Sequence, residues 1–474
     1  MKRILLLFCL GIFCYPLHGA AQLKSTTSEI FELSSIAFRL ASAEEYMHCP
    51  IPSYVEDIDN YFASYSDHEF IRFIKQIREN YLIGYDAVGS AAANLVVIDG
   101  NIAISPDFDK SRISEIDARW EVGVYGKYVD LMNEFFKDTH FDKFYSDHRK
   151  LYDVATSRAD KLLENIDIKW FGSFFGEELG QVRIMASLCS GQCNYAYPLL
   201  NKNNEFGIII GCRADTKGLP VYSAWTPHTI IHELSHCFTN KLIEGIWDRI
   251  EPAALKIYPY VQQRLLKEGA IGFPTNMIYE WFTDLSTNMY FRENGAAKGI
   301  PLTLQIATQQ NKGFIWMEKS VDFMNGFYEN RDLYPYVKDY MPQISMFINE
   351  IASDFDQVIT DYENRNPRVV ETLPGPESTV ALDMDQIVIK FSEPMNTGLY
   401  GYGRTKEEGV LQVPALNGDK EFWQDDVTFV IPINNKKLIP NRRYGLSIKK
   451  YYFTSAKQYS LSEDFTLYFN TCAK

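Results

Sequence analysis

The sequence predicts an α+β protein in which a mostly helical domain with a small sheet precedes an all-β C-terminal domain. Helical periodicity dominates up to about residue 364, and strand-like alternation interrupts it once, at residues 181–212. Beyond residue 366, short apolar runs separated by turns follow one another, a rhythm typical of a β-sandwich. With 474 residues, 46% of them hydrophobic, the chain is long enough for about two or three domains with filled cores.

The first 21 residues have the three regions of a secretory signal peptide. Lys2-Arg3 supplies the charge, Ile4 to Tyr15 is apolar, and Gly19-Ala20-Ala21 offers a cleavage site. The apolar run has about 12 residues where a membrane span needs about 20. Cys9 and Cys14 each follow Phe, which disfavours a lipoprotein. We expect cleavage after Ala21 and a mature protein that is secreted, periplasmic or associated with the cell surface.

The N-terminal third is predicted to be helical, because its apolar residues recur at spacings of three and four. We expect these positions to form core: Ile30, Leu33, Ile36, Ala37, Leu40, Ile58, Phe62, Phe70, Phe73, Ile74 and Ile77.

Residues 181–212 are predicted to contain strands. Val182, Ile184 and Ala186 alternate with polar or larger neighbours, Asn203-Asn204 offers a turn, and Phe206–Cys212 is a short apolar run with glycines. We interpret this stretch as a β-hairpin that lies just before the next helix.

The functional prediction depends on the motif His232-Glu233-Leu234-Ser235-His236. A helix is predicted to begin at Thr226-Pro227, because Thr caps helices well and Pro is favoured at the first helical position, and to cover residues 228–242. The two histidines then lie on one face about 6 Å apart along the axis, so both imidazoles can bind one zinc ion. Glu233 lies beside them as a general base for the attacking water. The residues expected to face the core are Ile230, Ile231, Leu234 and Phe238.

A catalytic zinc ion usually has three protein ligands, and no histidine follows the motif. The third ligand should therefore be a carboxylate. Glu280 is the best candidate, and Asp284 shares its face of an apolar, helix-compatible segment, where it could accept the N–H of a ligand imidazole. Asp284, Glu244 and Asp248 are the alternatives for the third ligand. His228 lies about 12 Å along the helix from the second motif histidine, too far for both to bind one ion.

These residues resemble the gluzincin class of zinc metallopeptidases, in which a helix with HExxH is followed by a helix with ExxxD. The resemblance implies that His232, His236 and Glu280 hold zinc. In this chain 44 positions separate His236 from Glu280, more than the usual interval of about twenty. In that class an edge strand near the zinc helix pairs with the substrate backbone, and the predicted hairpin would supply it. The alternative is a buried strand that does not contact substrate.

A further resemblance covers most of residues 25–365. The phrases that carry it are Ala37-Phe38-Arg39-Leu40-Ala41 with Glu45-Tyr46, Tyr61-Phe62 before Asp67-His68, Tyr85-Asp86, and Cys237-Phe238-Thr239-Asn240 after the zinc motif. They resemble a secreted bacterial family of unknown function with predicted gluzincin-type peptidase character. Only the zinc motif carries chemistry, so this resemblance implies little about the substrate.

The helical pattern is predicted to end at Asn364-Arg365-Asn366-Pro367. Short strands are then expected at residues 387–391, 427–431 and 444–448. Phe391-Ser392-Glu393-Pro394-Met395 and the stretch 438–444 resemble the bacterial Ig-like domains of exported proteins. The predicted organisation is therefore a signal peptide (1–21), a zincin-like domain (22–365) and an Ig-like sandwich (366–474), which would dock to a cell surface, a glycan or a protein.

The net charge and the cysteines of the chain indicate which partners and which metal sites are not expected. Without Lys2 and Arg3 the chain keeps 45 basic and 61 acidic side chains, a net charge of −16 that repels nucleic acid and anionic membranes. Six cysteines remain after Ala21, and the best local pairing is Cys189 with Cys193 or Cys212, the alternative being buried thiols. The cysteines are assigned no metal, because no second close pair accompanies the first.

The sequence thus predicts an exported zinc metallopeptidase. His232, His236 and Glu280 hold Zn²⁺, Glu233 is the general base, Asp284 orients a ligand, and the substrate is a peptide or protein. The oxyanion donor stays open among Tyr195, Tyr197, Tyr279 and Tyr290. The competing hypothesis is an extracellular peptide- or glycan-binding protein that uses the same scaffold without turnover.

Overall fold

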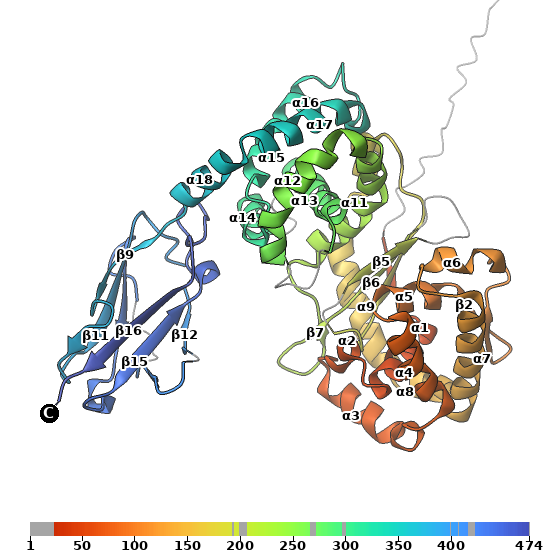
Figure 1. The fold of residues 1–474 in the computed structure, drawn as a ribbon. Coiled ribbons are helices and arrows are strands. Elements are labelled where there is room, and N and C mark those ends of the chain that lie inside the picture. The colour runs from red at the N-terminus through yellow and green to blue at the C-terminus, as the bar shows by residue number, and fades with distance from the viewer. Residues whose placement is uncertain are drawn as a thin grey trace, which may run out of the picture. The chain divides into compact units, whose positions relative to one another are not determined.

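A computed structural model describes residues 23–191, 194–198, 206–265, 272–295, 300–398, 400–405, 407–415 and 422–473 (Figure 1). The fold is mixed α+β, about half helical with several small sheets, as the sequence predicted. The predicted signal peptide lies outside the described residues. The chain forms two compact units, one of residues up to Ser173 with Glu177–Glu233, the other of Phe174–Gly176 with Leu234–Lys474. The predicted domain boundary after residue 365 falls inside the second unit.

Helices build most of the first unit. Their apolar positions recur at helical spacing, and the stripe predicted from Ile30 to Ile36 is buried, as are Phe70, Ile74 and Ile77. The first helix begins where the Ser28 hydroxyl accepts the Phe31 N–H at 3.2 Å. The helices are α1 (Glu29–Leu40), α2 (Glu44–Met47), α3 (Pro52–Tyr61), α4 (Glu69–Tyr81), α5 (Asp86–Ala93), α6 (Ile113–Ile116), α7 (Val122–Asp138), α8 (Phe141–Asp147), α9 (Arg149–Leu163) and α10 (Lys169–Phe175).

The main sheet of this unit has four strands in the order β1, β4, β6, β5. These are β1 (Ser25–Thr26), β4 (Val182–Ala186), β5 (Tyr195–Pro198) and β6 (Phe206–Ile210). An antiparallel pair of strands is present within the predicted stretch, formed by β5 and β6, but β4 joins the sheet as the parallel partner of β6, with Ile184 opposite Ile208. Alternation revealed the strands but not their partners, because it reports the buried face and not the strand direction. Asn203-Asn204 lies outside the described residues.

The two last strands of this sheet approach each other so closely that one position has to be glycine. A Cβ atom built on Gly207 would lie 2.3 Å from the ring of Tyr197, which is buried. Glycine is therefore required where the edge strand crosses its neighbour. Two small hairpins complete the unit: β2 (Leu95–Ile98) with β3 (Asn101–Ile104), and β7 (Arg213–Ala214) with β8 (Pro220–Val221).

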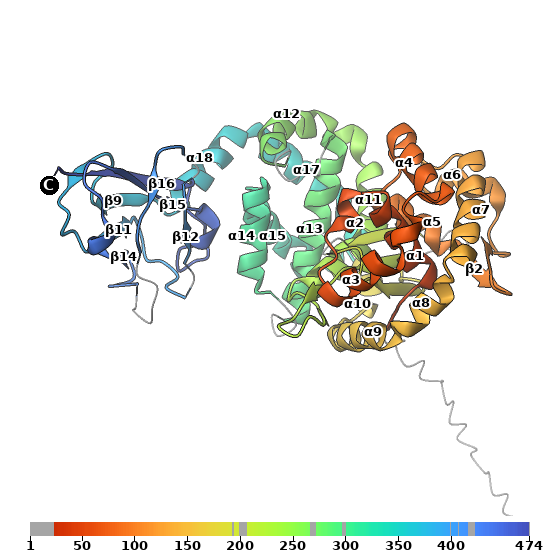
Figure 2. The ribbon, with the colours of Figure 1, turned by 90° about the horizontal axis from the view of Figure 1, so that it is seen from below.

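The long helix α11 (Thr226–Glu244) begins in the first unit and ends in the second, so the unit boundary falls inside a continuous helix. In the second unit α12 (Trp247–Leu265) packs against α13 (Pro274–Asn294) and α17 (Val337–Ser353), as Figures 1 and 2 show. The remaining helices are α14 (Leu302–Lys312), α15 (Met317–Phe323), α16 (Asn325–Glu329) and α18 (Phe355–Arg365).

Helical spacing in the sequence predicts one core stripe made of Leu333, Tyr336, Val337, Tyr340, Ile344 and Phe347. This prediction is correct within α17 and wrong before it. Val337 and Ile344 are fully buried. Leu333 and Tyr336, expected to belong to the same stripe, are 68% and 38% exposed. They precede the first helical residue, where the spacing of three and four no longer places side chains on one face.

The predicted C-terminal strands are present and form two sheets. One contains β10 (Thr379–Val380), β12 (Tyr402–Gly403), β13 (Leu411–Gln412), β15 (Arg443–Ile448) and β16 (Phe465–Thr471); the other contains β9 (Val369–Leu373), β11 (Gln386–Phe391) and β14 (Thr428–Pro432). Alternate residues such as Ile387 and Ile389 face a core shared with Leu446 and Leu467 of the other sheet. Of the helices that the structure describes, none has the length and hydropathy to cross a membrane.

Candidate metal centre

Apolar and polar side chains of helix α11 lie on different faces, as the sequence predicted. Ile230, Ile231 and Leu234 have no exposed surface, and Phe238 is 6% exposed. His232, Glu233 and His236 are only half-buried. The helix begins at Thr226, the residue predicted to cap it, and continues to Glu244. The motif is therefore helical, and its polar side chains lie away from the core face.

Helix α13 brings the predicted third ligand opposite this face. The hydroxyl oxygens of Thr239 on α11 and Thr283 on α13 lie 2.6 Å apart, and both side chains are fully buried. One turn before Thr283, the half-buried Glu280 points its Oε1 at the Nε2 of His236, 3.5 Å away. A contact between small polar residues thus sets the spacing between the two helices at the site.

The ligand atoms of His232, His236 and Glu280 all lie within 4.8 Å of one another. Two atoms that are each about 2.1 Å from a tetrahedral zinc ion are separated by about 3.4 Å, which matches the 3.5 Å between His236 and Glu280. In the part of the chain that the structure describes, no other group of His, Cys, Asp or Glu side chains meets this criterion. The donor set and its spacing fit a zinc ion.

A directional chain of hydrogen bonds assigns the tautomer of His236. The Thr239 hydroxyl donates to the Ser235 carbonyl at 3.0 Å, so its oxygen must accept the proton of Thr283. The Thr283 oxygen, 3.2 Å from Nδ1 of His236, is then left as an acceptor, and Oδ1 of Asn240 lies 3.1 Å from the same nitrogen. We therefore place the proton on Nδ1. The lone pair on Nε2 faces the Glu280 carboxylate, an arrangement that a cation between them stabilises.

Asn240 and Thr283 contact His236 in the candidate site, and the sequence had assigned neither of them. Asn240 lies four residues after His236, so helical spacing alone could have identified it. Thr283 carries no such signal, because its contact depends on how α13 packs. Asp284, predicted to orient a ligand imidazole, is 3% exposed on α13. The imidazole N–H of His236 is directed to Asn240 and Thr283 instead, so Asp284 remains a candidate only for His232.

The other predicted residues are placed as follows. The ring of His228 stacks on that of His232 at 6.4 Å between centroids, and His228 is not part of the cluster. Glu244 accepts a hydrogen bond from the Tyr279 hydroxyl at 3.2 Å. This contact joins an alternative third ligand, Glu244, to one of the oxyanion candidates, Tyr279. The buried Tyr197 hydroxyl lies 3.8 Å from the sulfur of Met185. These contacts favour Glu280 over Glu244 as the third ligand.

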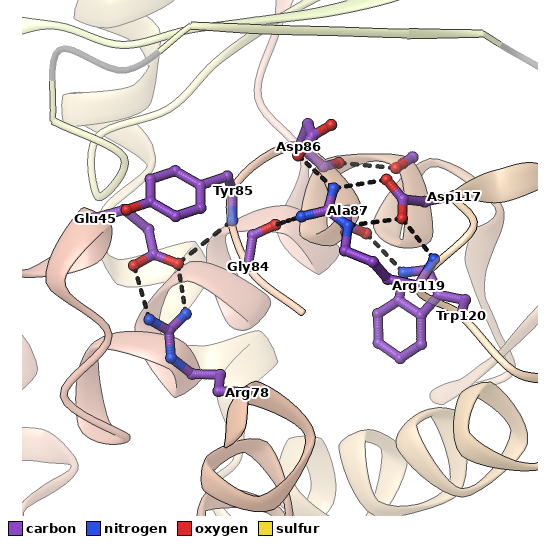
Figure 3. Close-up of polar contacts among 10 residues, drawn as sticks. Glu45, Arg78, Gly84, Tyr85, Asp86, Ala87, Asp117, Arg119 and Trp120 are labelled. Carbon is purple, nitrogen blue, oxygen red and sulfur yellow. Dashed lines mark hydrogen bonds and ion pairs between the residues drawn. The ribbon is translucent and has the colours of Figure 1, made fainter. Parts of the chain in front are cut away.

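A separate polar cluster in the first unit joins two phrases of the predicted family resemblance (Figure 3). Arg78 binds the buried Glu45 carboxylate through both nitrogens, at 2.5 and 3.1 Å, and the Tyr85 N–H donates to the same carboxylate at 3.3 Å. Arg119 bridges Asp86 and Asp117, each at 2.6 Å.

The role of this cluster is structural. It holds the start of α5, where Tyr85 adopts a positive φ of 52° and Trp120 donates its indole N–H to the Ala87 carbonyl at 2.9 Å. A Cβ on the preceding Gly84 would lie 2.7 Å from the Glu45 carboxylate. The backbone therefore has to approach the ion pair closely at this position.

Comparison with protein families shows which family the chain belongs to. Residues 20–347 match a family described as a domain of unknown function, DUF4932. The chain belongs to this family. No curated protein matches the chain. Among solved structures it is similar to surface layer protein SbsC, domains 1–6, with 10% identity and a TM-score of 0.16 over 51% of this chain and 33% of that one. A second SbsC structure, of residues 31–844, gives 12% identity and a TM-score of 0.18 over 52% of this chain and 32% of that one. The matches thus span about a third of those chains and carry no argument about fold or function.

Proposed function

We propose that this member of the DUF4932 family is a zinc-dependent peptidase. The observation that supports the proposal is the cluster of two imidazoles and one carboxylate, with 3.5 Å between His236 Nε2 and Glu280 Oε1. Two histidines and a carboxylate are the ligand set of many catalytic zinc sites, which keep a fourth position for water or substrate. The likeness to gluzincins, with HExxH on α11 and ExxxD on α13, belongs to the same proposal.

When bound, zinc would supply Lewis acidity, which polarises a carbonyl group and makes water a nucleophile near neutral pH. The chain's own residues supply the rest. His232, His236 and Glu280 hold the ion, and the tautomer of His236 keeps its Nε2 basic. Glu233 takes the proton of the attacking water and delivers it to the leaving amine. Asn240 and Thr283 keep the His236 ring oriented.

The choice of a peptide as substrate is supported by the sheet of the first unit. β5 (Tyr195–Pro198) is the last strand in the order β1, β4, β6, β5 and forms an edge of this sheet in the part of the chain that the structure describes. Such an edge can add an extended peptide through backbone hydrogen bonds. We also propose that the protein is exported and that its C-terminal domain is Ig-like and serves for docking. The predicted signal peptide is consistent with export, and the two C-terminal sheets are consistent with an Ig-like domain.

The decisive experiment compares Glu233→Gln with Glu244→Gln. Both substitutions neutralise a carboxylate on α11, but Glu244 is outside the cluster and bonds to Tyr279. We expect Glu233→Gln to retain stoichiometric zinc and to lower peptide hydrolysis by about 10²–10⁴-fold. Glu244→Gln should keep both zinc and activity.

Profiling with a diverse peptide library supplies the substrate for this assay. Wild-type protein that binds zinc but cleaves nothing, and binds peptides equally before and after Glu233→Gln, would contradict the peptidase and favour the extracellular binding protein. Loss of zinc in Glu244→Gln would show that the ligand set is wrong.

A further inference from the structure

Two cysteines far apart in the sequence meet in the first unit. Cys49, just after α2, and Cys189, just after β4, lie close enough for each thiol to be the largest single influence on the other's pKa. The surrounding backbone agrees: the Cys189 sulfur lies 3.9 Å from the Tyr46 carbonyl oxygen. A Cβ on Gly191 would lie 2.9 Å from the His48 carbonyl oxygen. The segments 46–49 and 189–191 therefore run against each other.

A buried carboxylate fixes both segments. Glu32 of α1 has no exposed surface and accepts the Leu188 N–H at 3.0 Å. Its other oxygen accepts the hydroxyl of Tyr54, in the helix that follows Cys49, also at 3.0 Å. One side chain thus anchors the residue before Cys189 and the helix after Cys49. Both cysteines therefore lie in segments whose positions the fold already determines, so joining them requires little further ordering of the chain.

We propose that Cys49 and Cys189 form a disulfide when the protein meets a disulfide oxidant, as exported proteins do. The Cys49 thiolate attacks one sulfur of the oxidant's disulfide and expels the other as a thiolate. The Cys189 thiol, as its proton leaves, then attacks the Cys49 sulfur and expels the second thiolate. One S–S bond forms in the protein and one breaks in the oxidant, which takes up two electrons and two protons.

The environment assigns different roles to the two cysteines. The hydrogen bond from Cys189 lowers the pKa of Cys49, which is half-buried and reachable by an oxidant. The same hydrogen bond, with burial, raises the pKa of Cys189 well above its ordinary value. Cys49 is therefore the attacking sulfur and Cys189 the resolving one.

The predicted pairing of Cys189 with Cys212 stays a prediction, since the structure shows both, like Cys49, as free thiols. Burial raises the pKa of the Cys212 thiol. Spacing along the chain pointed to Cys212, whereas the fold sets the segment that ends at Cys49 beside Cys189. The other predicted partner, Cys193, lies outside the described residues.

The test uses the full chain, fully reduced and then incubated with oxidised glutathione, followed by unfolding, alkylation and peptide mapping without reductant. We expect one linked peptide pair joining Cys49 to Cys189 and the loss of two alkylated thiols. Cys212→Ser is the matched control, because it removes a neighbouring buried thiol, and it should give the same linked pair. Cys189→Ser should leave Cys49 as a mixed disulfide with glutathione.

Thermal unfolding provides a second measurement on the same samples. A cross-link across the chain between residues 49 and 189 should raise the melting temperature of the oxidised wild type by roughly 5–10 °C over the reduced form, and Cys49→Ser should lose this difference. A map that links Cys189 to Cys193 or Cys212, or that finds both Cys49 and Cys189 alkylated after oxidation, would overturn the proposal. None of these outcomes depends on the zinc site.

Discussion

Replacing Thr283 by Val tests the hydrogen-bond chain that orients the imidazole of His236, a proposed zinc ligand. Val has nearly the shape of Thr but removes the oxygen that lies 3.2 Å from His236 Nδ1 and 2.6 Å from the Thr239 oxygen. Because Asn240 still accepts the imidazole N–H, we expect zinc affinity to fall by about tenfold. The double variant with Asn240→Leu should lose about 100-fold, since no acceptor then orients the ring.

The same variant has a calculable effect on stability. Thr283→Val leaves the fully buried Thr239 oxygen without its donor, which should cost about 1–3 kcal/mol of unfolding free energy in the metal-free protein. Adding Thr239→Val removes the orphaned oxygen and should restore most of that loss without restoring zinc affinity.

Thr287→Val is the matched control. Thr287 is equally buried on α13 and donates to the Thr283 carbonyl at 2.8 Å, but it does not touch the imidazole. Zinc affinity is measured by competition with a chromogenic chelator, and stability by chemical denaturation. The reasoning fails if Thr283→Val, alone and with Asn240→Leu, binds zinc as tightly as Thr287→Val.

Three further predictions follow from other contacts. Glu280→Ala should weaken zinc binding by at least about 100-fold, because losing a ligand costs more affinity than losing a residue that orients a ligand. Unchanged affinity in the chelator assay would exclude Glu280 as a ligand. Gly207→Ala should destabilise the protein by about 1–3 kcal/mol because of the Tyr197 ring, whereas Gly126→Ala, in the helix α7 with open space around its Cβ, should stabilise it by about 0.5–1 kcal/mol. A denaturation experiment in which both alanines had the same effect would contradict this. Burial raises the pKa of Glu32 above 4.5, so the folded state holds that proton more tightly than the unfolded state does. The stability of the wild type relative to Glu32→Gln should therefore be greatest below pH 4.5 and decline as the pH rises through the raised value, and a flat difference would refute it.

Local signals in the sequence were sufficient where a feature depends on one element. The cap and proline at Thr226-Pro227 predicted α11, and helical spacing predicted that Leu234 is buried while His232 and His236 share the opposite face. Glu280 could be proposed because a carboxylate in an apolar helix needs a partner. The strands at 387–391 and 444–448 were likewise visible as apolar runs.

Features that depend on contacts between elements could not be predicted. The alternation of Val182–Ala186 does not reveal that β4 pairs in parallel with β6, because strand direction is set by the connections. The imidazole contact of Thr283 and the meeting of Cys49 with Cys189 depend on packing between segments far apart in the chain. Neither leaves a periodic trace in the sequence.

The most direct test of the central claim is a crystal of the protein grown with zinc and measured on both sides of the zinc absorption edge. The account predicts a strong anomalous peak bound by the Nε2 atoms of His232 and His236 and a Glu280 oxygen, each about 2.0–2.2 Å away. A crystal whose anomalous map shows zinc only at other residues, or none between these three side chains, would contradict it.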